Sequence, residues 1–209
     1  MRCITGTAAT FRPMMKLAAT VLAVSGCLAL PATAAVPPPH SAPSPVVSTL
    51  RFVLRLDHAG KVVRFEGKTI ALVVLSTECP IARKAIGGDT GVNAGADKLA
   101  ADNVELFGVI SDPTVTRGAA VDFARAPGVK FPVLFDAIGE LATLLAPERI
   151  REAFVYNFTG SLGYRGRINN VYVALGQPRA AVTEENLLDA ALAVVSQELV
   201  KVDRTGPVG

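Results

Sequence analysis

The sequence predicts an α/β fold in which a mixed central β-sheet carries helices on both faces. Two runs of strand-forming residues, 70–76 and 104–111, are apolar throughout, as expected of strands covered on both faces. Helical patterns alternate with the strands, and an antiparallel strand pair near the end of the chain is followed by one last helix. These observations favour one α/β domain over residues 47–200.

Residues 1–35 predict a secretory signal peptide. They hold basic but no acidic residues, then an apolar run and the Ala-rich sequence "ATAA", which resembles a cleavage site. A rival interpretation is a lipobox, "VSGC", which would attach a lipid to Cys27. The apolar run of about 14 residues is shorter than the roughly 20 that span a bilayer, so no transmembrane span is expected in the mature chain. We therefore expect an exported protein, periplasmic or extracellular, or one anchored through Cys27.

Removing this segment changes the net charge. The whole chain has 21 basic and 18 acidic residues, a net charge of +3. Arg2, Arg12 and Lys16 lie in the segment, so the remainder has 18 residues of each sign and a net charge of zero. No basic stripe is present, and the sequence therefore predicts no nucleic-acid partner.

Cys79 is the single cysteine of the predicted mature chain, because Cys3 and Cys27 fall in the signal. An internal disulfide is therefore excluded. His40 lies in the linker and His58 in a turn, and no His, Cys and acidic residues have metal-ligand spacing. No phosphate-binding glycine motif is present either. We expect no metal and no cofactor.

The segment before the second apolar strand contains a linker, a hairpin and a broken helix. Residues 36–46 are rich in Pro and Ser and predict an extended linker. The segment "LRFVLRLDHAGKVVRF" predicts an amino-terminal β-hairpin extension that turns at residues 57–60. Four glycines between residues 87 and 95 disfavour a continuous helix, each by about 1 kcal/mol relative to Ala. We expect one or two helical turns after Cys79, a break, and helix again near residues 96–101.

Two helices and a short strand are predicted after the strand 104–111. Asp112 precedes Pro113, a pair typical of a helix cap and first turn. Residues 131–135 predict a short strand. Asp136 predicts the cap of the next helix, whose apolar residues are Ile138, Leu141 and Leu145.

The last part of the domain predicts two strands and a helix. Residues 152–158 and 161–168 flank a Thr-Gly turn and predict an antiparallel pair. We expect Arg165 and Arg167 on this pair to be solvated. Thr183 predicts the cap of the final helix, and residues 201–209 predict a tail. The predicted core-facing stripe of the helix is Leu188, Leu192, Val195 and Leu199.

Cys79 is the candidate functional residue, since it lies where a buried strand ends and a helix begins. Pro80 fits the first helical position, and the N–H groups and positive dipole of a helix start favour a thiolate. Arg83, one turn later, would add positive charge, whereas Glu78 would oppose it. The alternative is a buried structural cysteine without chemistry.

Three segments resemble redoxins, the thioredoxin-fold family that includes alkyl hydroperoxide reductase and thiol-specific antioxidant proteins. They are "GKTIALVVLSTECPIAR", "GVKFPVLFDAIGELATLL" and "EAFVYNFTGSLGYRGRINN", and the similarity covers about residues 50–200. "TECPIAR" and "YRGRI" resemble a secreted bacterial branch in particular. The resemblance implies a thioredoxin-like fold and a thiol-dependent oxidoreductase, peroxiredoxin-like, with antioxidant and redox-homeostasis roles.

The resemblance also implies site residues. Peroxiredoxins carry an arginine three residues before the phenylalanine of a strand facing the cysteine, which corresponds to Arg151 before Phe154. They carry a hydroxyl residue three before the cysteine, here Ser76. The implied site is Cys79, Arg151 and Ser76, which Thr77, Pro80 and Arg83 would help to shape. It would reduce a peroxide, or act on a thiol substrate, with an external thiol as reductant.

The sequence departs from the family patterns in three ways. Leu72 stands where peroxiredoxins place a proline that shields the thiolate, and Ala82 stands where thioredoxins place a second cysteine. No resolving cysteine is present. Two alternatives therefore stay open: a catalytically degenerate binding or scaffold module, and a one-cysteine thiol oxidoreductase without peroxidase activity. Arg151 has its own alternative, an ordinary surface arginine, and the oligomeric state is left open.

Overall fold

The computed structural model describes a large part of the predicted domain. The described residues are Leu50, 55–80, Arg83, 86–87, 91–126, 128–174 and 176–208. The predicted signal peptide, the lipobox at Cys27 and the linker at 36–46 lie outside them. Within the described ranges, no helix has the length and apolar character needed to cross a membrane.

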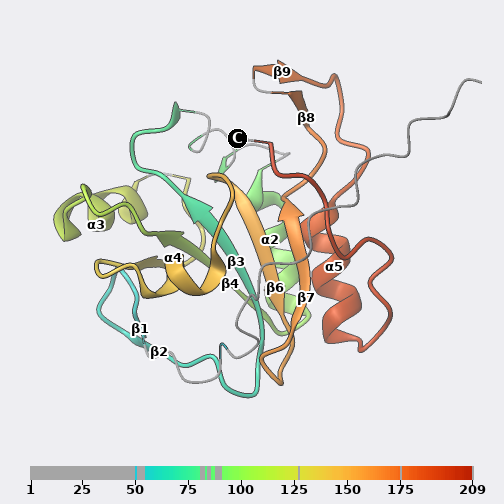
Figure 1. The fold of residues 1–209 in the computed structure, drawn as a ribbon, viewed down its shortest axis with the longest axis horizontal. Coiled ribbons are helices and arrows are strands. Elements are labelled where there is room, and N and C mark those ends of the chain that lie inside the picture. Colours follow the sequence, from blue (N-terminus) through green and yellow to red (C-terminus); the bar gives the residue numbers. More distant parts are fainter. Residues whose placement is uncertain are drawn as a thin grey trace, which may run out of the picture. The chain divides into compact units, whose positions relative to one another are not determined.

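A five-stranded mixed sheet forms the centre of the fold, with strand order β5-β4-β3-β6-β7 (Figure 1). β3 is parallel to β4 and β4 to β5, whereas β6 is antiparallel to both of its neighbours. The strands are β3 (Thr69–Leu75), β4 (Val104–Ile110), β5 (Val133–Phe135), β6 (Glu152–Tyr156) and β7 (Leu162–Arg167). Two small antiparallel pairs accompany the sheet: β1 (Arg55–Leu56) with β2 (Val62–Val63), and β8 (Tyr172–Ala174) with β9 (Gln177–Pro178). The predicted hairpin, strands and antiparallel pair are confirmed.

Side chains of the central strand β3 are buried on both faces of the sheet. One set, which includes Val73, packs with α2 (Val92–Ala101) and α5 (Asn186–Val195). The alternate set, which includes Leu72, packs with α4 (Glu140–Leu145) and the β1–β2 hairpin. All seven residues of β3 are buried, which explains its uninterrupted apolar run. The predicted α/β class, with helices on both faces of a mixed sheet, is confirmed.

The break predicted after Cys79 is also present. The helix that opens at Pro80 continues through a hydrogen bond from Gly87 N to Arg83 O of 3.3 Å. α2 then begins at Val92, with Gly91 as its cap. The second helix thus resumes four residues before the predicted start at residue 96.

The helix start predicted at Asp112 is wrong. Asp112 instead closes a turn, because its Oδ1 accepts hydrogen bonds from the N–H and the hydroxyl of Thr114 at 2.8 and 2.6 Å. α3 (Arg117–Arg125) begins five residues later, where the Thr116 hydroxyl accepts from Ala119 N at 3.2 Å. The Asp112 side chain therefore stabilises a local turn and does not cap a helix.

The prediction that Asp136 caps the next helix is right in part. Asp136 Oδ2 accepts from Ala142 N, in the first turn of α4, at 2.9 Å. Gly139, at φ +71°, is the residue that immediately precedes the helix. Ile138 lies before that turn and is 78% exposed, so it does not belong to the buried stripe.

The last helix begins later than predicted. Thr183 does not cap it, because its hydroxyl accepts from Asn170 Nδ2 at 2.6 Å and α5 starts at Asn186. The buried residues of the helix are Leu187, Ala190, Ala191 and Val194. Leu199 lies beyond the helix end and is 89% exposed. The predicted stripe was therefore out of phase by one residue at most positions.

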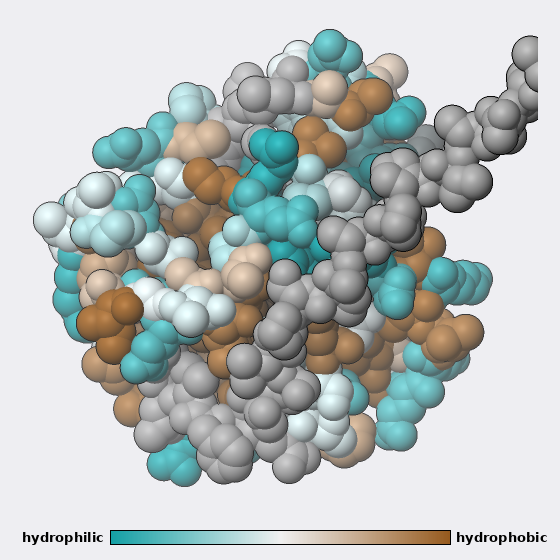
Figure 2. Space-filling view, viewed as in Figure 1, coloured by the Kyte–Doolittle hydropathy of each residue, from teal (hydrophilic) through white to brown (hydrophobic). Residues whose placement is uncertain are grey.

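Hydrophobic residues on the outside of the molecule are interspersed with polar ones on the face shown in Figure 2. Val173 in β8 is 58% exposed and Ile150, next to β6, is 39% exposed. Single exposed residues of this kind are ordinary in folded proteins.

The side chain of Tyr164 in β7 is buried, and its hydroxyl donates to Arg167 O at 2.6 Å. Burial raises the pKa of Tyr164 to about 12, above its ordinary value of 10.0. Burial also raises the pKa of Tyr156 in β6. The folded state therefore disfavours the phenolate at both positions.

We expect the free energy of unfolding to fall as the pH rises from about 10 to about 12. The contribution of Tyr164 is fully present below its unfolded pKa near 10 and is lost as the pH approaches its folded pKa, a change of about 2–3 kcal/mol. Urea unfolding at pH 9–12 should show a shallower decline in Tyr164→Phe than in the unaltered protein. Parallel pH profiles for the two proteins would contradict this assignment.

Candidate functional site

Cys79 lies four residues beyond the carboxyl end of β3, immediately before a helix. The helix begins at Pro80, and Arg83 N donates to Cys79 O at 3.2 Å. The cysteine is half-buried and carries a free thiol. The carboxyl ends of the strands are the edge at which open α/β sheets place their sites. The predicted placement of Cys79 is confirmed.

The predicted neighbours of Cys79 have distinct environments. Ser76 is buried, and its hydroxyl accepts from Glu78 N at 3.3 Å, which holds the turn that leads to the cysteine. Thr77 is half-buried and Pro80 is exposed. The Arg83 guanidinium lies over the ring of Phe123, 5.6 Å from its centre, and so packs against α3.

Arg151 is buried beside the end of β3. Its N–H donates to Val74 O at 2.7 Å, which ties the residue before β6 to the end of β3. Its φ of +73° is unusual for a residue with a side chain. Only 7% of the residue is exposed. The interpretation of Arg151 as an ordinary surface arginine is therefore wrong.

The guanidinium of Arg151 is poorly satisfied. It lies over the Tyr172 ring, 4.8 Å from the ring centre, and its Nη1 donates to Val208 O at a long 3.4 Å. Its buried Nε has no hydrogen-bond partner among the described residues. Burial lowers the pKa of Arg151, and the charges of Tyr172 and Cys79 act in the opposite direction. The guanidinium is thus a buried cation beside the end of β3, the strand that leads to Cys79.

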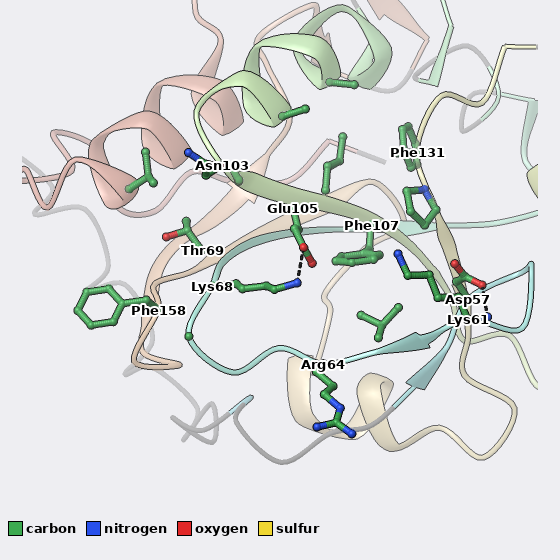
Figure 3. Close-up of a pocket in the computed structure, with 18 of the residues that line it drawn as sticks. Asp57, Lys61, Arg64, Lys68, Thr69, Asn103, Glu105, Phe107, Phe131 and Phe158 are labelled. Atoms are coloured by element: carbon green, nitrogen blue, oxygen red, sulfur yellow. Dashed lines mark hydrogen bonds and ion pairs between the residues drawn. The ribbon is translucent and has the colours of Figure 1, made fainter.

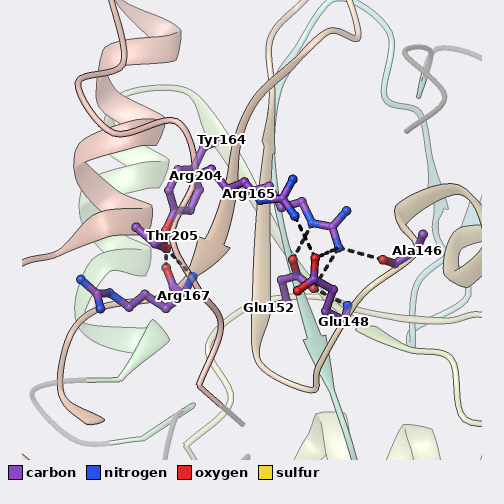
Figure 4. A network of polar contacts seen from close by, with 8 residues as sticks. All are labelled: Ala146, Glu148, Glu152, Tyr164, Arg165, Arg167, Arg204 and Thr205. Carbon is purple, nitrogen blue, oxygen red and sulfur yellow. Dashed lines mark hydrogen bonds and ion pairs between the residues drawn. The ribbon is translucent and has the colours of Figure 1, made fainter. Parts of the chain in front are cut away.

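A buried ion pair holds the loop that carries Arg151 (Figure 4). Arg165 Nε in β7 donates to Glu152 Oε1 in β6 at 2.6 Å, and both residues are buried. Arg165 Nη2 donates to Ala146 O at 2.8 Å, while Glu152 Oε2 accepts from Glu148 N at 2.6 Å. Both ends of the pair therefore bind the backbone of residues 146–151.

The prediction of solvated strand charges is wrong for Arg165 and right in part for Arg167, whose side chain is 26% exposed. Arg165 is 5% exposed, and Arg167 binds Glu184 at 2.6 Å and Asn186 at 2.8 Å. One sequence signal could have identified the buried pair. When the two strands are aligned as an antiparallel pair, Glu152 lies diagonally opposite Arg165, and opposite charges at such positions attract.

Leu72 occupies the middle of β3. It is fully buried and pairs with Phe107 in β4 and Phe154 in β6. A proline at this central position would remove a hydrogen bond from the sheet. The position that the family resemblance gives to a shielding proline is therefore inside the sheet.

A groove of about 710 Å³ lies at the opposite end of the strands from Cys79. It is lined by the amino ends of β3 and β4, including Thr69 and Val104, and by Phe107 and an exposed Lys68–Glu105 ion pair (Figure 3). Within the described ranges, no three His, Cys, Asp or Glu residues are grouped so that they could hold a metal ion.

Comparisons with known proteins show the fold. No protein-family model and no curated protein matches the sequence. A hypothetical protein from Sinorhizobium meliloti aligns with a TM-score of 0.58 at 20% identity, over 74% of this chain and 88% of that one. An uncharacterized conserved protein from Geobacillus kaustophilus aligns with a TM-score of 0.58 at 17% identity, over 73% and 82%. DsbF from MTB aligns with a TM-score of 0.51 at 16% identity, over 68% and 94%. The chain thus has a thioredoxin-like fold.

We expect Glu152→Gln to lower the free energy of unfolding by about 3 kcal/mol, because it leaves the buried Arg165 charge with only the exposed Glu148 carboxylate, 3.4 Å away, as its anion. Urea denaturation at pH 7 measures this loss. Glu105→Gln, in the exposed pair with Lys68, is the matched control and should cost at most about 1 kcal/mol. Similar losses in the two variants would show that the buried pair stabilises the fold no more than the exposed pair does.

Proposed function

We propose that this protein is an exported, thiol-dependent oxidoreductase that reduces peroxides through Cys79. The observation that carries the proposal is the buried Arg151 guanidinium, whose Nε is unpartnered among the described residues and whose backbone binds the end of β3, the strand that leads to Cys79. A cation held beside a cysteine favours the thiolate, which is the reactive form. Cys79 is half-buried, so its thiol is accessible to a small substrate.

The chemistry needs a nucleophile and a donor for the peroxide oxygens. The Cys79 thiolate attacks one peroxide oxygen, so that an S–O bond forms and the O–O bond breaks. The leaving alkoxide or hydroxide takes up a proton and departs as an alcohol or water. Arg151 donates to the oxygens during this step, and a guanidinium hydrogen bond to a developing anion is among the strong ones. Cys79 is oxidised to a sulfenic acid and the peroxide is reduced.

An external thiol then completes the cycle, since Cys79 is the only cysteine after the predicted signal. The sulfenic acid condenses with one thiol to a mixed disulfide and releases water. A second thiol attacks that disulfide, frees Cys79 and leaves as an external disulfide. If residues 1–35 act as the predicted signal, the reductant is a thiol of the exported compartment.

A second candidate is a one-cysteine thiol oxidoreductase that forms mixed disulfides without reducing peroxides. The placement of Leu72 inside β3 favours it, because no proline at that position shields the thiol. The two candidates use the same nucleophile and differ in the oxidant, a peroxide or a disulfide.

We expect Cys79 to form a sulfenic acid with hydrogen peroxide at pH 7, and Arg151→Gln to slow this step by about tenfold or more. Trapping with a dimedone probe and mass spectrometry measures the rate. Cys79→Ser should give no trapped product, and Arg149→Gln, two residues from Arg151 and exposed, is the matched control.

The outcomes separate the candidates. Unchanged peroxide reactivity in Arg151→Gln would show that the proposed site is wrong. Slow reaction with peroxide but rapid mixed-disulfide formation with a small disulfide would favour the thiol oxidoreductase. Slow reaction with both reagents would favour a binding or scaffold module with an inert cysteine.

A further inference from the structure

The carboxy-terminal segment 203–208, here called the strap, runs along the outer side of β7. Arg165 N donates to Asp203 O at 3.0 Å, and Thr205 N donates to Arg165 O at 3.1 Å. These two bonds form a parallel bridge between Arg165 and Arg204. The tail predicted from sequence is therefore docked on the sheet, and Figure 1 shows the end of the chain near the β8–β9 pair.

Thr205 is the main anchor of the strap (Figure 4). Its hydroxyl accepts from Arg167 N at 2.9 Å and lies 2.7 Å from the Tyr164 hydroxyl. Gly166, at φ +155°, makes room for it, because a Cβ there would lie 2.6 and 2.8 Å from the backbone O and N of Thr205. Arg204 adds an ion pair with Glu148, at 2.8 Å, in the loop that precedes Arg151.

This docking brings Val208 O to the Arg151 guanidinium. The hydrogen bond from Nη1 is long, at 3.4 Å, and a neutral carbonyl satisfies one of the five N–H groups of the side chain. Nε is buried and unpartnered among the described residues. A carboxylate offers two charged oxygens and binds a guanidinium through two parallel hydrogen bonds. It is therefore a better partner for Arg151 than the carbonyl it would replace.

We propose that Arg151 is a binding subsite for a carboxylate group of the substrate or of the thiol reductant, and that the strap fills it with Val208 O until a carboxylate displaces it. The inference rests on the proposed thiol chemistry of Cys79. Its new content is the class of ligand, a carboxylate-bearing peroxide or thiol. This carboxylate and Val208 O would compete for the Arg151 guanidinium. Tyr172 stacks on the guanidinium and leaves the in-plane N–H groups to the competing acceptors.

The first test compares alkylation of Cys79 by iodoacetate and iodoacetamide. With both reagents an S–C bond forms, the C–I bond breaks and iodide leaves, so the reagents differ in charge and not in the step. Thr205→Val loosens the strap, and Gly166→Ala forces its backbone away. Each should raise the iodoacetate-to-iodoacetamide rate ratio by about fivefold, since the carboxylate then meets an unoccupied cation.

Two further variants make this test specific. Adding Arg151→Gln to Thr205→Val should remove the increase in the ratio. Thr143→Val, which removes a hydroxyl bond to Gly139 O on the exposed side of α4, should leave the ratio unchanged. An unchanged ratio in folded Thr205→Val and in Gly166→Ala would overturn the proposal, as would an increase that persists without Arg151.

The second test does not use the thiol. In Cys79→Ser, hydrogen exchange of the Arg165 and Thr205 amides reports release of the strap. Sodium acetate should accelerate exchange at least about threefold relative to sodium chloride at equal ionic strength, and Arg151→Gln should abolish the difference. Equal exchange in the two salts would overturn the strap proposal without affecting the peroxide result. An acetate effect alongside a peroxide-inert Cys79 would retain the carboxylate subsite and remove the proposed peroxidase.

Discussion

The buried pair of Glu152 and Arg165 is the interaction on which the candidate site depends. Two charges withdrawn from water are tolerated when each is paired and hydrogen-bonded, and both conditions hold here. The partners that complete the pair are Ala146 O, Glu148 N and the Glu148 carboxylate, all in the loop before Arg151. The requirement to satisfy the pair therefore fixes the path of the loop that delivers Arg151.

The loop contains two residues with unfavourable backbone angles, which its contacts hold in place. Ala146 and Arg151 both have left-handed backbone angles, φ +41° and +73°, and such residues are about 1–3 kcal/mol less favourable than ordinary ones. They persist because the surroundings determine their positions: Arg165 binds Ala146 O, and β3 accepts the Arg151 N–H. The result is a buried guanidinium that contacts Tyr172 and Val208, whereas the sequence "ERIRE" is typical of a solvated loop.

Features that depend on local residue types, such as buried strands, were predicted from the sequence. Features that depend on contacts between residues far apart in the sequence were not. The apolar run of β3 and the position of Cys79 at its end follow from local residue types, so both were predictable. The predicted helix starts were wrong where the expected cap side chain binds another group, as the Thr183 hydroxyl binds the Asn170 amide. The burial of Arg151 follows from its register beside Val74, and no local pattern contains that information. Val208 was missed for the same reason, because its contact joins residues 57 positions apart.

The docked strap, residues 203–208, also affects how the protein associates with other chains. β7 is the outermost strand of the five, and an uncovered strand edge is a template for pairing with other chains. The strap forms hydrogen bonds with both the N–H and the C=O of Arg165, so it covers this edge in the middle of β7. Any event that lifts the strap from β7 would also leave the Arg165 N–H and C=O unpaired at this edge. The opening by a carboxylate proposed above would therefore also favour edge-to-edge association.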